Sequence, residues 1–209
     1  MNGLTVEIGN TDAEGRLVMA DTMTYIQRNY NPKRVAYIAT LTGSCIVALG
    51  KSTAGLFSTD DEMVEAFEKA SEDAFEPVWH LPLNDEHRDI IKGRSGADLN
   101  NIGAYRWGGS SQAAAFLERF IEGNRPWVHL DIAGPVTYGK SENGDASGFG
   151  AKLLLSYIDK YIPSADPKTW VPNPTCDEFT NAQKNLSKGP WNPSSGTKAP
   201  SNDAMNKLD

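Results

Sequence analysis

The chain has 209 residues, with 27 acidic and 20 basic side chains and a formal net charge of −7. An acidic protein is poorly suited to bind the phosphate backbone of nucleic acids, so we expect no nucleic-acid partner. The length allows a domain with a sizeable core, and no apolar run is long enough to span a membrane. Two cysteines, Cys45 and Cys176, make no disulfide framework and fit a reducing, cytoplasmic compartment.

Apolar periodicity predicts strands and helices along the first 162 residues. In chain order these are a buried strand at 4–8, a helix from 17 to 31, a strand at 34–40 covered on both faces, a short strand or loop at 52–57, a helix from 58 to 75 with a hydroxyl cap, an extended link at 77–83, a short polar helix at 85–92, a helix at 111–121 capped by Ser110, a strand at 126–132 and a helix at 151–161. The first strand leads directly into the first helix. In open α/β sheets ligands bind at such strand-to-helix turns.

The turn at residues 9–16, here called the acidic turn, carries Asp12, Glu14 and Arg16. Residues two apart in an extended segment point to the same side, so both carboxylates could face one site. Carboxylate oxygens suit zinc, manganese or magnesium, and a shared carboxylate commonly bridges two metals. A guanidinium stays protonated and therefore binds anions instead of acting as a base. The alternative is a solvated acidic turn in which Arg16 is a surface counter-charge.

The three histidines do not have the spacing of a zinc hydrolase. We interpret His80 and His87 as structural residues. His129 and Asp131 share one face of a predicted strand, where they could bind a metal, but we favour a buried hydrogen bond between them. Asn100 and its neighbour Asn101 suit turn formation or hydrogen bonding.

The composition changes at residue 163, after which proline, asparagine, serine and lysine dominate. We therefore expect a domain at 1–162 and a C-terminal extension at 163–209. The extension has too few apolar residues to form a core of its own. It is either a flexible tail or an arm that braces an oligomer, with Trp170, Val171 and Trp191 as docking residues.

The run from Asn10 to Leu17, followed by Val-Met-Ala-Asp, closely resembles the signature of the leucyl aminopeptidases, the M17 family of cytosol aminopeptidases. Further segments match in the same order, at 39–43, 97–103, 129–134 and 145–150, the last with Ser147 in place of threonine. The resemblance covers about residues 1 to 160. It implies an α/β fold, with a mixed, largely parallel sheet covered by helices on both faces and incomplete at its N-terminal side.

The resemblance also implies an exopeptidase that releases N-terminal, leucine-like residues from peptides with two divalent metal ions. Asp12 would bind one metal, Glu14 would bridge both, and Arg16 would hold a bicarbonate that serves as general base. The substrate-binding residues would be Asn10, Thr40, Leu41, Gly43, Ile102, Ala133 and Val136. The family often has methionine where Val136 stands, and it forms homohexamers.

In the family a metal-binding lysine, two further aspartates and a catalytic lysine come from sequence upstream of this signature. That block is missing here, so we expect the chain to begin within the catalytic domain and to be inactive alone. One alternative is a truncated, non-catalytic paralogue that acts as a structural or interaction subunit. Another is a different metal hydrolase on a similar sheet, for which histidine ligands near Asp12 would be needed.

Overall fold

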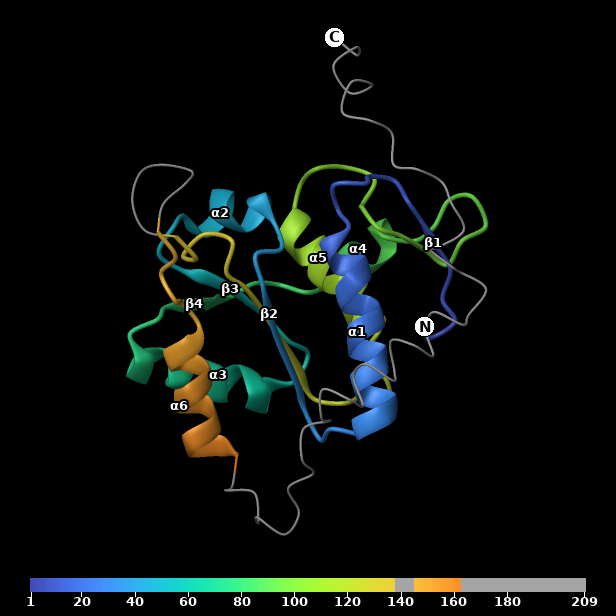
Figure 1. The fold of residues 1–209 in the computed structure, drawn as a ribbon. Coiled ribbons are helices and arrows are strands. Elements are labelled where there is room, and N and C mark those ends of the chain that lie inside the picture. The colour runs from blue at the N-terminus through green and yellow to red at the C-terminus, as the bar shows by residue number, and fades with distance from the viewer. Residues whose placement is uncertain (138–144, 163–209) are drawn as a thin grey trace, which may run out of the picture. The chain divides into compact units, whose positions relative to one another are not determined.

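The computed structural model describes residues 1–137 and 145–162. Its elements, in chain order, are β1 (Val6–Glu7), α1 (Gly15–Tyr30), β2 (Val35–Ala39), α2 (Gly43–Leu49), β3 (Ala54–Phe57), α3 (Asp61–Ala74), β4 (Val78–His80), α4 (Asp85–Ile90), β5 (Leu99–Asn100), α5 (Gly109–Glu118), β6 (Trp127–Asp131) and α6 (Ala151–Tyr161) (Figure 1). The extension at 163–209, with both interpretations of it, lies outside the described residues.

The strands form two sheets. The larger has the order β2-β6-β3-β4, in which β2 pairs with β6 and β3 with β4 in parallel, whereas β3 and β6 are antiparallel. The smaller consists of β1 and β5, which are also parallel. This confirms the predicted α/β fold with a mixed, largely parallel sheet.

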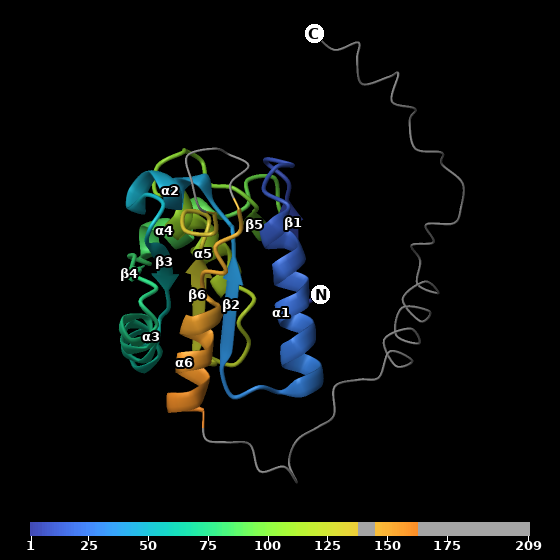
Figure 2. The ribbon, with the colours of Figure 1, turned by 60° about the vertical axis from the view of Figure 1, so that its left-hand side comes forward.

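Helices cover both faces of the larger sheet (Figure 2). On one face Leu56 and Leu130 pack into a buried cluster with Phe67 of α3 and Leu153 of α6. On the other face, Phe57 and Trp127 pack with Ala114 of α5, and α1 packs against α5. Because side chains alternate along a strand, adjacent residues such as Leu56 and Phe57 supply the two cores.

The first two strands are less buried than predicted. In place of a buried strand at 4–8, only Val6 and Glu7 form a strand, both partly exposed, and Ile8 is 52% exposed. Strand β2 is also partly exposed, although it has the predicted cover on both faces, because Ile38 packs against one core and Tyr37 against the other. Each of these strands pairs on one side only among the described residues. The apolar pattern showed which residues favour a strand, but it could not show how many neighbours the strand has.

Two predicted caps were wrong. Helix α3 is capped by the Asp60 carboxylate, which accepts a hydrogen bond from the amide of Met63 at 2.8 Å, and not by a hydroxyl. Helix α5 begins at Gly109, two residues before the prediction, so Ser110 lies inside the helix. The residue that precedes α5, Gly108, has a φ of 64°, which glycine adopts without strain. Helix α6, in contrast, has the predicted bounds.

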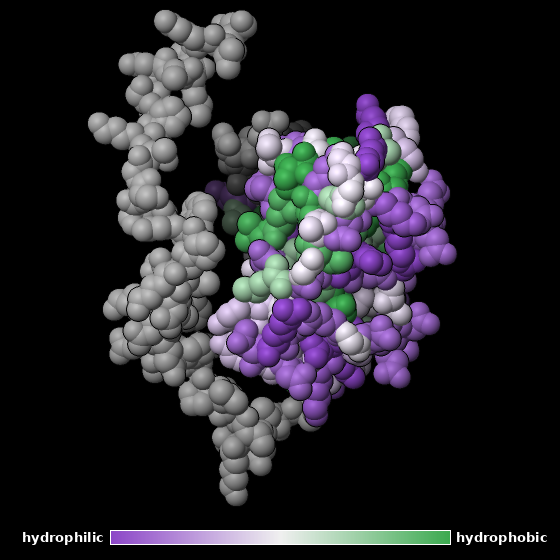
Figure 3. All heavy atoms as spheres, turned by 90° about the vertical axis from the view of Figure 1, so that its right-hand side faces the viewer, coloured by the Kyte–Doolittle hydropathy of each residue, from purple (hydrophilic) through white to green (hydrophobic). Residues whose placement is uncertain are grey.

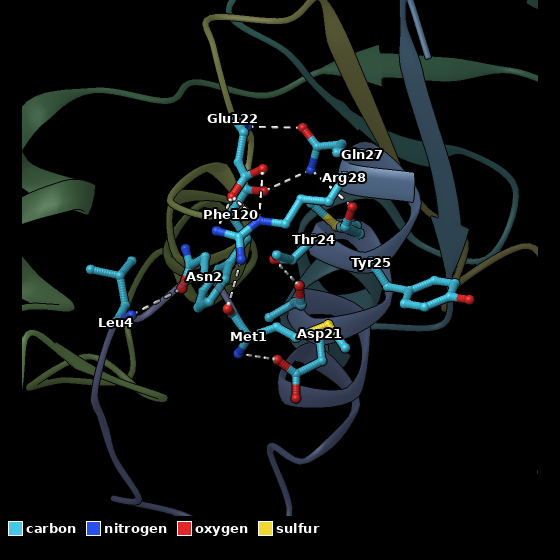
Figure 4. Close-up of polar contacts among 12 residues, drawn as sticks. Met1, Asn2, Leu4, Asp21, Thr24, Tyr25, Gln27, Arg28, Phe120 and Glu122 are labelled. Atoms are coloured by element: carbon cyan, nitrogen blue, oxygen red, sulfur yellow. Dashed lines mark hydrogen bonds and ion pairs between the residues drawn. The ribbon is translucent and has the colours of Figure 1, made fainter. Parts of the chain in front are cut away.

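A polar network fastens the end of α1 to the end of α5 (Figure 4). The buried amide of Gln27 donates to the carbonyl of Phe120 at 2.8 Å and accepts from the amide of Glu122 at 2.9 Å. Arg28 adds an ion pair with the Glu122 carboxylate at 2.7 Å. These contacts fix α1 on the domain and thereby orient its other end, at the acidic turn.

The side of the molecule that carries α1 is partly apolar. Hydrophobic residues gather over the upper half of this face, and hydrophilic residues dominate the lower half (Figure 3). Val18 and Ile26, both on α1, are 65% and 40% exposed. Among the helices in the described ranges, none has the length and apolar character needed to cross a membrane.

Candidate functional site

The acidic turn lies between β1 and α1, at the end of the molecule where parallel strands finish. Residues 11 and 12 form a turn, and Glu14 already has helical backbone angles, with φ −76° and ψ −32°. The segment is therefore not extended, so the strand alternation on which the prediction was based is absent. That both carboxylates face one site stays a prediction. The Asn10 side chain supports the turn by accepting from the amide of Asp12 at 2.9 Å. Both carboxylate residues, Asp12 and Glu14, are exposed.

Arg16, two residues after Glu14, is in contrast buried and is only 9% exposed. Its Nη1 donates to the backbone carbonyl of Asn101 at 2.8 Å, and its Nε has no hydrogen-bond partner. Burial lowers the pKa of Arg16 to about 10, while the negative charge of Asp131 opposes that shift. Arg16 is therefore charged at neutral pH and is not the surface counter-charge of our alternative interpretation. An anion would satisfy its free N–H and its charge.

A second group of loops, here called the sheet-edge loops, follows the C-terminal ends of β2 and β6 at residues 40–43 and 132–136. The fully buried carboxylate of Asp131 joins them. It accepts hydrogen bonds from the amides of Leu41 at 3.1 Å and Ala133 at 3.2 Å, and from the Thr42 hydroxyl at 2.7 Å. Burial raises the pKa of Asp131, and these hydrogen bonds oppose the rise. The sheet-edge loops are therefore built around a buried carboxylate.

The predicted hydrogen bond between His129 and Asp131 was wrong. His129 is fully buried and stacks between Tyr37 and Phe57, with ring centroids 4.7 and 5.8 Å away. Neither of its ring nitrogens has a hydrogen-bond partner. Burial lowers the pKa of His129 to about 3, so the imidazole is neutral at physiological pH. The Asp131 carboxylate turns instead to Thr42.

The other two histidines lie away from the acidic turn. His80 ends β4 and is exposed. His87 belongs to a capping box at the start of α4, where its amide donates to the Asn84 side chain at 3.2 Å. These positions fit the interpretation of both as structural residues.

The structure brings the predicted substrate-binding residues together in two groups. Asn10 and Ile102 lie at the acidic turn, where a Cβ added at Gly9 would be 2.8 Å from the Ile102 side chain. Leu41 and Ala133 meet at the Asp131 carboxylate. Leu41 also links the two groups, because its Cδ1 lies 4.0 Å from a Cβ built at Gly15.

The remaining three candidates are less closely placed. Thr40 and Gly43 are exposed at the end of β2, where Gly43 begins α2. A Cβ at Gly43 would meet no atom within 4 Å, so glycine is not required there by packing within the chain. Val136 packs beside the core formed with α3 and α6.

Two buried polar residues, Asn101 and Asp131, have larger structural roles than their sequence pattern indicates. The pattern predicts only that Asn101 forms a turn or a hydrogen bond, and that Asp131 forms a hydrogen bond with His129. Their partners lie about 90 positions away in the sequence, in the acidic turn for Asn101 and after β2 for Asp131. Local pattern carries no signal of such contacts.

Two surface hollows of about 420 and 410 Å³ lie elsewhere, around Phe75 at the end of α3. The first lies between α3 and α6, and the second is bounded by Trp79 of β4. Both are open and shallow and contain none of the predicted site residues. The candidate site therefore rests on its chemistry and not on a deep cavity.

Residues 1–155 match the family described as "Cytosol aminopeptidase family, catalytic domain". The chain belongs to this family. Proteins named "probable cytosol aminopeptidase" are 50% identical over 160 residues in Chlorobaculum tepidum, covering 76% of this chain and 31% of the relative, and 48% identical in Cenarchaeum symbiosum, covering 75% and 33%. A mutant of tomato leucine aminopeptidase superposes with a TM-score of 0.70 at 38% identity, over 75% of this chain and 30% of that one.

These matches confirm the predicted membership of the cytosol aminopeptidase family and its fold. The chain spans about a third of the length of the curated relatives it matches.

The donor set of the acidic turn fits part of a metal centre. Asp12 and Glu14 offer hard oxygen donors that are exposed to solvent. Within the ranges that the structure describes, no three histidine, cysteine, aspartate or glutamate side chains are grouped so as to hold a metal ion. Two carboxylates leave most coordination positions open, so these residues would be two ligands of a centre that other residues complete.

Proposed function

We propose that this chain supplies the metal-binding turn, an anion site and part of the substrate pocket of an aminopeptidase that removes leucine-like residues from the N-termini of peptides. The observation that carries the proposal is the acidic turn itself. Two exposed carboxylates, Asp12 and Glu14, precede a buried arginine whose Nε has no hydrogen-bond partner among the described residues. Family membership supports the same assignment.

Each residue of the turn has a role that its surroundings support. Asp12 would bind one divalent metal ion and Glu14 would be shared by two. Zinc or manganese would suit these carboxylate ligands, with magnesium as a further option. When bound, such ions supply Lewis-acid activation of a water and of the scissile carbonyl. Arg16 would hold a small anion, bicarbonate, against the turn, since its guanidinium is charged and buried and its Nε has no hydrogen-bond partner among the described residues. Arg16 would thereby hold a general base beside the acidic turn.

The substrate would lie between the acidic turn and the sheet-edge loops. We assign substrate contacts to Asn10, Thr40, Leu41, Gly43, Ile102, Ala133 and Val136. Leu41 and Ile102 support this assignment most directly, because both are apolar, only partly buried and close to the turn. Apolar side chains of this kind suit a leucine-like residue. The backbone groups of residues 40–43 would bind the peptide's polar atoms.

We propose further that the site is incomplete in this chain, which would then be inactive alone. The donor set supports the need for a further polypeptide, because Asp12 and Glu14 leave most coordination positions open and no third histidine, cysteine or carboxylate joins them among the described residues. That polypeptide would be the rest of a full-length catalytic domain or other copies in a homohexamer. A cytoplasmic location fits relatives that are named cytosol aminopeptidases.

A second candidate function is that of a structural or interaction subunit without catalysis. It is favoured by the small donor set, since the described part of the acidic turn contributes only Asp12 and Glu14. The buried Arg16 favours the enzyme instead. Burying a charged guanidinium costs free energy, and a bound anion would offset part of that cost.

The two candidates can be separated with a chimera. Residues 1–160 of this chain replace the matching 160 residues of the Chlorobaculum tepidum protein, and hydrolysis of leucine p-nitroanilide is measured with Mn²⁺. We expect the chimera to be active and the 209-residue chain alone to be inactive. Asp12→Asn and Arg16→Met in the chimera should each lower kcat by about 100-fold or more.

Three results would contradict the proposal. A folded chimera without activity would favour the structural subunit. Undiminished kcat in the Asp12→Asn chimera would remove the metal role of the turn. Full-length rates from the chain alone would show that the site is complete as it stands.

A further inference from the structure

One buried side chain, that of Asn101, holds the main chain of the acidic turn from two sides. Its Oδ1 accepts hydrogen bonds from the amides of Gly9 at 2.8 Å and Asn10 at 3.2 Å. Its Nδ2 donates to the carbonyls of Asn10 at 2.7 Å and Ala13 at 3.3 Å. Asn101 is fully buried, so water does not compete for these bonds. The four contacts bracket Asp12 in the sequence.

Only a primary amide can make this set of contacts. The turn presents two N–H donors and two carbonyl acceptors, and the asparagine side chain offers both complementary groups. A carboxylate has acceptors only and would face the carbonyls of Asn10 and Ala13 without a proton to share. An apolar side chain would leave the backbone groups of the turn unpaired.

Asn101 also contacts Arg16, through its backbone. The backbone carbonyl of Asn101 accepts from Nη1 of Arg16 at 2.8 Å. We infer that Asn101 is a positioning residue, which sets the carboxylates of Asp12 and Glu14 relative to the guanidinium of Arg16. The inference rests on the proposed function, because it concerns the metal affinity of that turn.

The position of the two carboxylates depends on the backbone that carries them. No ion pair between described residues involves Asp12 or Glu14. Side-chain contacts therefore do not fix them, and the turn must do so. In metal sites, loss of a residue that orients the ligands typically weakens metal binding by about 10- to 100-fold. In the acidic turn, Asn101 is the residue that would orient the two carboxylate ligands.

The test compares two buried amides in the full 209-residue chain. Asn101→Leu removes the side-chain hydrogen bonds at the turn and replaces asparagine with an apolar side chain of similar shape. The control is Gln27→Met, because Gln27 is 3% exposed and also makes four hydrogen bonds, at the other end of α1 (Figure 4). MnCl₂ is titrated into each ¹⁵N-labelled protein, and the line broadening of amide resonances at Asp12 and Glu14 gives the apparent Kd. Urea unfolding gives the stability of each variant.

We expect Asn101→Leu to raise the Mn²⁺ Kd at the turn by about tenfold or more. Gln27→Met should change that Kd less than twofold, even if it lowers the free energy of unfolding as much as Asn101→Leu does. An unchanged Kd in Asn101→Leu would overturn the inference and leave the metal-binding turn intact. Two carboxylates alone bind Mn²⁺ weakly, so the titration is carried to saturation of the line broadening or to the solubility limit of the salt. Absence of broadening at the turn of the unmodified chain would overturn the inference, whereas the proposed function is tested separately by the activity of the chimera.

A second measurement needs no variant. The amides of Gly9 and Asn10 belong to exposed residues but donate to Asn101. We expect their hydrogen exchange in the unmodified chain to be slowed by about 100-fold or more relative to an unstructured peptide. Exchange at the unstructured rate would show that Asn101 does not hold the turn, whether or not Asn101→Leu folds.

Discussion

The acidic turn and the sheet-edge loops lie beside each other, yet each is organised by a different kind of buried side chain. The turn is held by Asn101, a neutral amide that gives and accepts hydrogen bonds. The sheet-edge loops are held by Asp131, a carboxylate that only accepts them. Arg16 adjoins both, since it bonds to the Asn101 carbonyl and interacts with the Asp131 charge.

The difference follows from what each region presents. The turn exposes both amides and carbonyls, so it needs a group with mixed character. The sheet-edge loops present N–H and O–H donors at the ends of β2 and β6, so a carboxylate matches them. A buried carboxylate carries a larger desolvation cost than a buried amide. Removing the carboxylate leaves several hydrogen-bond donors unpaired. We therefore expect Asp131 to matter more for stability and Asn101 more for metal affinity.

The largest expected effect is that of Asp131→Ala. Removing the carboxylate orphans the amides of Leu41 and Ala133 and the Thr42 hydroxyl, and leaves Arg16 without a nearby opposite charge. We expect a loss of about 3 kcal/mol in the free energy of unfolding, measured by urea denaturation.

The exposed Asp159 on α6 provides the control for this change, and Asp159→Ala should leave the urea midpoint nearly unchanged. Equal effects of the two substitutions would contradict the central place of Asp131 in the sheet-edge loops.

The next effect concerns His129, which lies on the same strand as Asp131. Its pKa is lowered to about 3 by burial, whereas an unfolded histidine titrates near 6.5. Between these values the unfolded chain binds the extra proton, so the contribution of His129 to stability is lost as the pH falls below 6.5. At pH 4.5 the loss is roughly 2.5 kcal/mol.

His129→Phe removes the titrating group and keeps an aromatic ring in the stack. Urea unfolding from pH 7 to pH 4.5 should therefore show a shallower loss of stability in this variant than in the unmodified chain. The raised pKa of Asp131 acts in the opposite direction in both proteins, so the difference between their curves isolates His129. Parallel curves would mean that the imidazole accepts a proton without unfolding.

The smallest expected change in stability is that of Asp12→Asn. The Asp12 side chain is exposed and its substitution breaks no internal ion pair of the described residues, so the free energy of unfolding should change by no more than about 0.5 kcal/mol. Mn²⁺ broadening at the turn should nevertheless decrease strongly. A large loss of stability would instead show that Asp12 has a structural role. It would contradict the view that the sheet-edge loops determine stability and the acidic turn metal affinity.

Much of the fold could be predicted because local pattern determined it. Strands β3 and β6 are buried along their whole length, and α6 has a clear apolar stripe, so their positions came directly from the apolar residues. The start of α5 could not be predicted in this way, because it depends on the left-handed backbone of Gly108. The short, exposed β1 was overestimated, because a strand's burial depends on neighbours that sequence pattern does not specify.

The candidate site was also predicted unevenly. Asp12, Glu14 and Arg16 stand within five residues and form a recognisable motif. That motif could not show the burial of Arg16, which arises from packing against the segment around Asn101. The role of Asp131 was missed for a related reason. It shares a strand face with His129, but the carboxylate finds its partners on another strand's loop.

The pairing of the acidic turn with Asn101 also bears on how the protein folds. The two segments are separated by about 90 residues, and β1 pairs with β5 across the same interval. Closing such a long loop costs entropy before any contact repays it, and contacts of this range slow folding. Helices such as α3 and α6 can form from local interactions, whereas the turn has no defined geometry until its distant partner arrives. We therefore expect the turn to gain its geometry only when β1 pairs with β5, and to lose it when β1 detaches.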